Sequence, residues 1–81
     1  MKRHHKNNDY VNTHAKDPRG FGAWMFAVDV YSVRQCEWVH HEILGATDTF
    51  ARARKQVQDQ ALLEARTTFV GPVEVHTETL G

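Results

Sequence analysis

At 81 residues the chain is long enough for one small folded domain and too short for two. Ten basic residues balance ten acidic ones, so the formal net charge is zero and indicates no particular class of partner. The composition, 41% hydrophobic, is typical of a globular protein. No apolar run approaches the ~20 residues that cross a bilayer, which excludes a membrane-spanning protein.

The charges are unevenly distributed along the chain. Residues 1–20 hold five basic residues against two acidic ones, a net charge of +3, and few apolar side chains. Such a segment buries too little apolar surface to offset its ordering entropy. We therefore expect a flexible basic arm over residues 1–20 that ends at the turn signal of residues 17–20, followed by a single domain over 21–81 with a net charge of −3.

The next two segments predict an antiparallel hairpin. Residues 23–33 are rich in aromatic and β-branched residues at period two, which is typical of a strand, and a second strand is expected over 37–44. We expect the turn to pair Tyr31 with Cys36, because this register places Val39, His41 and Ile43 with the apolar side of the first strand. A shift by one residue would instead bury Glu42 without a partner, at a cost of several kcal/mol.

A helix and a last strand complete the expected fold. Gly45-Ala46 is expected to break the second strand, and residues 47–49 offer N-caps for a helix that runs to about Arg66. Alternation over 73–79 predicts a third strand, placed at an edge because Pro72 cannot donate to a ladder. The fold class is thus α+β, with the order β-β-α-β and a small antiparallel sheet that packs one helix on one face. The expected core is Phe26, Val28, Val39, Ile43, Phe50, Val57, Val73 and Val75.

No motif in the sequence specifies a catalytic site. Cys36 has no partner for an internal disulfide, which indicates a reducing, cytoplasmic compartment, and no base is in reach to make it a nucleophile. His40 and His76 share a predicted sheet face and, with Glu42 or Glu74, offer one arrangement for a metal ion, but ordinary surface histidines explain them better. We expect no enzyme activity, no metal and no cofactor.

The sheet face away from the helix is the strongest candidate for function. The side chains on an uncovered sheet face are usually polar, whereas several on this face are large and apolar. A contact surface for another chain explains this pattern, while an arm or loop folded over the face is the structural alternative. The predicted contact residues are Met25, Asp29, Tyr31, Trp38, His40, Glu42 and Glu74.

In its size, its acidic body and its expected β-β-α-β layout, the chain resembles small accessory proteins of phages and mobile elements, including anti-CRISPR inhibitors. The resemblance implies a protein-binding inhibitor whose partner is a basic, nucleic-acid-binding complex. Self-association into a homodimer through the same sheet is a second arrangement. A nucleic-acid-binding module that uses the basic arm and the sheet aromatics is the alternative function, and the acidic residues of the face argue against it because they repel phosphate.

Overall fold

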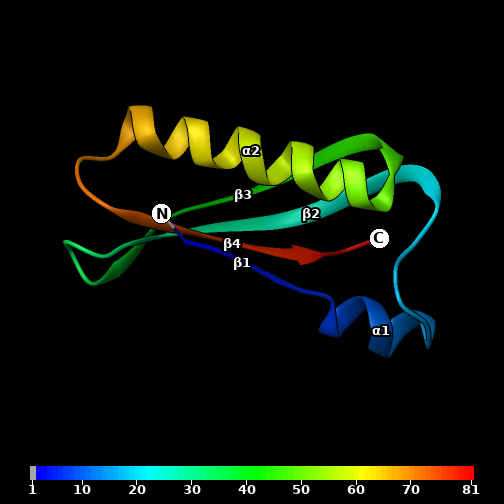
Figure 1. Ribbon diagram of the computed structural model, residues 1–81. Helices are drawn as coiled ribbons and strands as arrows, with labels where there is room; N and C mark the ends of the chain where they lie inside the picture. The colour runs from blue at the N-terminus through cyan, green and yellow to red at the C-terminus, as the bar shows by residue number, and fades with distance from the viewer. Residues whose placement is uncertain (1) are drawn as a thin grey trace.

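The computed structural model describes residues 2–81, except for the side chains of residues 2, 3, 8 and 9. The elements follow the order β1 (Lys2–Lys6), α1 (Asn8–His14), β2 (Phe21–Ser32), β3 (Glu37–Thr49), α2 (Phe50–Thr68) and β4 (Val73–Thr79). The four strands form one sheet, and the long helix α2 lies along one of its faces (Figure 1). No described helix is both long and apolar enough to cross a membrane.

The sheet is mixed, with the strand order β1-β4-β2-β3. The pairs β2–β3 and β2–β4 are antiparallel, whereas β1 runs parallel to β4. The α+β class is confirmed, but the expected order β-β-α-β and the all-antiparallel sheet are not, because a strand and a short helix precede the hairpin. The prediction that the last strand lies at an edge is also wrong. Pro72 lies just outside β4, so its missing N–H removes no bond from the ladder.

The segment expected to be a flexible basic arm contributes to the described fold instead. Its first residues form β1, whose backbone pairs with β4 from Lys2↔Glu74 to Lys6↔Glu78. Tyr10 of α1 is buried, with its ring centroid 5.6 Å from that of Trp24. The segment is anchored through backbone pairing, ring contacts and side-chain hydrogen bonds, which a scarcity of apolar residues in the sequence does not reveal.

A bulge in the hairpin makes the predicted register wrong. Tyr31 pairs with Trp38 rather than with Cys36, and the preceding residue, Val30, pairs with His40. Val39 therefore has no partner in β2 and is the extra residue of the bulge. Beyond the bulge the two strands pair without interruption up to Thr49. Because of this extra residue, the side chains of β3 from His40 onward lie on the opposite face of the sheet from the one that the predicted register gives them.

Gly45, expected to break the second strand, lies inside β3 opposite Met25. A Cβ atom at this position would lie 2.7 Å from the sulfur of Met25 and 3.3 Å from the Trp24 carbonyl oxygen. The glycine therefore lets the Met25 side chain lie across the neighbouring strand without a clash, and β3 continues past the expected break.

The core fills the space between α2 and the sheet. The helix contributes mostly small side chains, which let it lie close to the strands. The buried apolar residues of α2, β2 and β4 are Ala53, Val57, Ala61, Leu62, Ala65, Trp24, Phe26, Val28, Val30, Val73 and Val75. Val39 and Phe50 from the predicted core are half-buried and pack against this set, whereas Ile43 lies on the opposite face and is 56% exposed.

Candidate functional site

The face of the sheet away from α2, here called the open face, combines apolar, acidic and imidazole side chains. Trp38 and Met25 are 58% and 43% exposed on it, and the Trp38 ring meets Tyr31 edge-on with centroids 5.2 Å apart. The described side chains of the open face include His4, Lys6, Ala23, Met25, Ala27, Asp29, Tyr31, Trp38, His41, Ile43, Glu74, His76 and Glu78.

Five of the seven predicted contact residues lie on the open face, namely Met25, Asp29, Tyr31, Trp38 and Glu74. The other two, His40 and Glu42, were assigned to the wrong face.

The bulge explains the exchange, because it pairs His40 with Val30 and Glu42 with Val28, whose side chains point toward α2. Glu42 is nevertheless not buried without a partner. Its Oε2 lies 3.3 Å from His40 Nε2, and both side chains stay partly exposed at the outer strand of the sheet. The energetic objection to this register therefore does not apply, since an edge position leaves the carboxylate solvated.

The structure also separates the histidines considered as metal ligands and brings a different one into place. His40 and His76 lie on opposite faces, whereas His4 of β1 is the direct neighbour of His76 across the parallel β1–β4 pair. Their rings stack with centroids 4.2 Å apart and planes 9° from parallel. Glu74 lies two residues before His76 on the same face of β4, and its Oε1 is 3.4 Å from Nε2 of both histidines.

Trp38 of β3 borders this group across the intervening strand β2. Its ring centroid lies 4.8 Å from that of His76 in an edge-on arrangement. A shallow pocket joins the two regions, lined among others by His4, Lys6, Asp29, Trp38 and His76. The aromatic and the imidazole parts of the open face therefore form one continuous surface.

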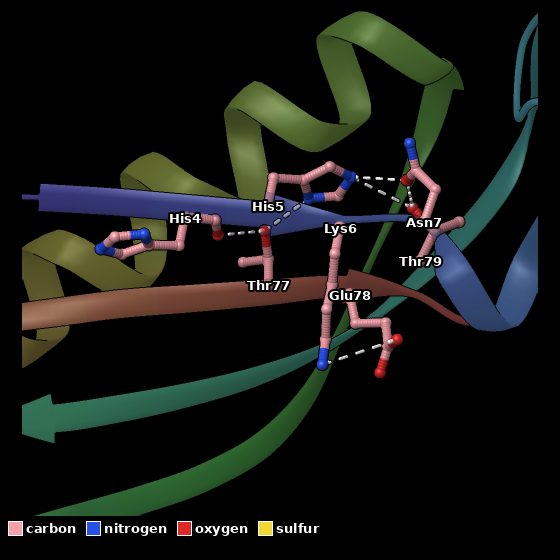
Figure 2. A network of polar contacts seen from close by, with 7 residues as sticks. All are labelled: His4, His5, Lys6, Asn7, Thr77, Glu78 and Thr79. Carbon is pink, nitrogen blue, oxygen red and sulfur yellow. Dashed lines mark hydrogen bonds and ion pairs between the residues drawn. The ribbon is translucent and has the colours of Figure 1, made fainter.

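The carboxylates of the open face each have a cationic or imidazole neighbour. Asp29 contacts His41 Nδ1 through a short hydrogen bond, and Glu78 lies 4.0 Å from the ammonium group of Lys6. Figure 2 shows the Lys6 and Glu78 side chains running together along the side of β1 and β4 opposite His5. Solvated pairs of this kind stabilise a fold by about 1 kcal/mol or less, so the carboxylates remain available to a competing cation.

His5 points the other way, into the layer between β1 and α2 (Figure 2). Its Nε2 lies 2.7 Å from the Asn7 side-chain oxygen and its Nδ1 lies 2.6 Å from the Thr77 hydroxyl. The buried Thr79 donates to the same Asn7 oxygen at 2.7 Å. A neutral ring satisfies this network, with Nε2–H donating to Asn7 and Nδ1 accepting from Thr77.

Burial lowers the pKa of His5 below its usual value of 6.5, and the positive charge of Arg54 acts in the same direction. The hydrogen bond to Asn7 opposes this lowering in part, since it favours the protonated ring. The environment of His5 therefore favours the neutral imidazole, which is compatible with this network.

Cys36 occupies the hairpin turn with a positive φ of 56° and an exposed thiol. Its thiol donates to the Val33 carbonyl oxygen at 3.5 Å.

Sequence reasoning missed His4 and Lys6 because they fall in the segment taken as an arm. Residues 2–6 are Lys-Arg-His-His-Lys, which alternate between two polar faces and carry none of the apolar period that predicts a strand. The pairing of this segment with β4 is a backbone interaction, and only the topology places His4 beside His76.

Comparisons with known proteins place no constraint on this site. No protein-family model matches the chain, and searches of curated proteins and of solved structures found no significant match.

Proposed function

We propose that the protein is a small, non-enzymatic protein-binding module that docks through its open face. The observation that carries this proposal is the exposure of large apolar side chains on one continuous sheet face, with Trp38 and Ile43 each more than half exposed. A solvated sheet face ordinarily presents polar residues at such positions. Contiguous apolar surface of this kind is typical of an interaction site.

Trp38 has the properties of an anchor residue. It is exposed, yet its orientation is restrained by edge-on contacts with Tyr31 on one side and His76 on the other. A restrained aromatic ring loses little conformational entropy when a partner covers it. Tryptophan and tyrosine are also enriched among the residues whose truncation weakens complexes most.

The carboxylates of the open face favour a partner with basic side chains. Asp29, Glu74 and Glu78 surround the aromatic residues, and their intramolecular partners are exchangeable imidazole or ammonium groups. An arginine of a partner would form stronger, bidentate hydrogen bonds with them. This chemistry fits an inhibitor of the anti-CRISPR type that occupies the basic surface of a nucleic-acid-binding complex.

The decisive measurement uses a partner captured from the source organism and then purified. We expect Trp38→Ala to weaken the binary complex by about thirtyfold, equivalent to ~2 kcal/mol, as measured by calorimetry. Leu63→Ala is the matched control, because Leu63 is equally exposed but lies on α2. Equal affinities for wild type and Trp38→Ala would place the interface elsewhere.

Two further measurements separate the competing functions. Direct nucleic-acid binding would appear as binding of labelled single-stranded or duplex DNA and RNA that weakens steeply with added salt. We expect no such binding, because three carboxylates lie on the open face. Light scattering of the isolated chain distinguishes a homodimer, in which the open face covers itself, from a monomer that keeps the face free for a different protein.

A further inference from the structure

Three side chains of the β1–β4 pair are arranged like the ligands of a metal ion. One nitrogen each from His4 and His76 and one oxygen from Glu74 lie within 4.8 Å of one another. Both nitrogen–oxygen separations are 3.4 Å. Metal–ligand bonds of about 2.0–2.2 Å at a tetrahedral zinc ion require ligand atoms about 3.3–3.6 Å apart. The observed spacing therefore matches two edges of such a tetrahedron.

We propose that His4, Glu74 and His76 bind a divalent transition-metal ion, with zinc as the reference ion. Two imidazoles and one carboxylate form a ligand set that zinc accepts in proteins, and three protein ligands leave a fourth position open. This site shares Glu74 with the proposed docking surface, but it does not use Trp38, on which the test of the docking function rests.

The fold presents these three ligands on strands rather than on loops. His4 and His76 are register partners, and Glu74 shares their face through the two-residue period of β4. Both Nε2 atoms lie within reach of the Glu74 oxygen. Because the ring planes are only 9° from parallel, the two imidazoles must turn toward each other for both nitrogen lone pairs to point at one ion.

The site is accessible to an ion from solvent. The side chains of His4, His76 and Glu74 are 45%, 32% and 27% exposed. An ion bound there would lie beside Trp38, whose ring contacts His76. The neighbouring tryptophan provides an optical probe of the site, because a paramagnetic ion such as Co²⁺ quenches the emission of a nearby indole.

The test is calorimetric titration of the full chain, free of affinity tags, with Zn²⁺. We expect saturable one-to-one binding that weakens at least tenfold in each of His4→Gln, Glu74→Gln and His76→Gln. Loss of a supporting residue around a metal site costs ten- to a hundredfold, and loss of a direct ligand should cost no less. His41→Gln is the matched control, since His41 is an exposed histidine of the same face outside the group, and we expect it to bind like the wild type.

A second readout uses Co²⁺ and tryptophan emission. We expect quenching in the wild type and its loss in Trp38→Phe, although Trp38→Phe still binds zinc in the calorimeter. The proposal is overturned if the wild type shows no saturable zinc binding, or if His41→Gln weakens binding as much as the ligand variants do. Normal zinc binding by a chain that has lost its protein partner through Trp38→Ala would keep the two proposals separate.

Discussion

His4 and His5 are consecutive in the sequence and occupy opposite environments. His4 lies on the open face, stacked on His76 with its ring accessible to solvent. His5 lies under α2, where its two nitrogens are used by Asn7 and Thr77. The strand pleat alone separates them, and the difference shows that one residue type can be part of the packed interior on one face and remain accessible to solvent on the other.

The largest effect should follow from removing the strand that carries both histidines. Deletion of residues 1–17 removes the buried Tyr10 and exposes the outer backbone edge of β4. Loss of a buried aromatic side chain costs about 3–5 kcal/mol, which corresponds to a fall in melting temperature of more than ~12 °C for a domain of this size. Thermal unfolding followed by circular dichroism measures this change. An unchanged melting temperature would mean that β1 contributes nothing to stability and that the contrast between the two histidines has no structural basis.

Substitutions on the two faces of the hairpin should also differ strongly. Phe26 is fully buried beneath α2, so Phe26→Ala should lower the free energy of unfolding by about 3–5 kcal/mol. Ile43 is apolar as well but lies on the open face, and Ile43→Ala should change stability by no more than ~0.5 kcal/mol. Urea denaturation of both variants tests the assignment of the faces. A larger loss of stability in Ile43→Ala than in Phe26→Ala would support the register predicted from the sequence, in which Ile43 belongs to the core.

A smaller difference is expected between the two histidines themselves. His5→Ala removes the hydrogen bonds of His5 to Asn7 and Thr77, each of which contributes about 0.5–1.5 kcal/mol, so the variant should lose about 1–3 kcal/mol. His4→Ala removes a solvated ring and should remain within ~0.5 kcal/mol of the wild type in the absence of metal. Chemical denaturation with a chelator present makes the comparison. Similar losses in the two variants would contradict the division of roles.

The smallest effect should be a pH dependence that originates at His5. Its pKa is lowered in the folded chain, so around pH 6.5 and below the unfolded chain binds more protons than the folded one. The contribution of the neutral His5 ring to the free energy of unfolding is therefore fully present above about pH 6.5, the pKa of His5 in the unfolded chain. It is lost as the pH falls from that value toward the lower pKa of His5 in the folded chain. We expect the wild type to lose stability as the pH falls below about 6.5, and His5→Gln to lose less. An identical pH profile in the two proteins would show that other groups cause the loss.

The hairpin, the helix and the last strand follow from local patterns in the sequence. Apolar residues at period two mark β2 and β4, and small residues at helical spacing mark α2, whose observed bounds of Phe50–Thr68 lie close to those expected. These elements bury their own apolar faces. Their signal therefore lies within the residues that form them.

The remaining features depend on partners that are distant in the sequence or on a single inserted residue. β1 has no apolar face and forms through backbone pairing with β4, so its own residues give no period to detect. The bulge at Val39 places His40 and Glu42 on the face opposite to the expected one, and no pattern of residue types in β3 signals this bulge. Met25, Asp29, Tyr31 and Glu74 were predictable because β2 and β4 alternate without an inserted residue, and Trp38 because it precedes the bulge in β3. His4 was not predictable.

The parallel pairing of β1 with β4 also sets the order in which the chain can fold. Contacts such as those between His5 and Thr77 join residues 72 positions apart. A loop of this length is costly in entropy to close, so β1 is expected to dock only after the hairpin, α2 and β4 have formed. An ion held by His4, Glu74 and His76 would connect β1 to β4, the two strands that close this loop. It would act as a reversible cross-link between the two ends of the chain and would shift the balance between closed and frayed forms according to metal concentration.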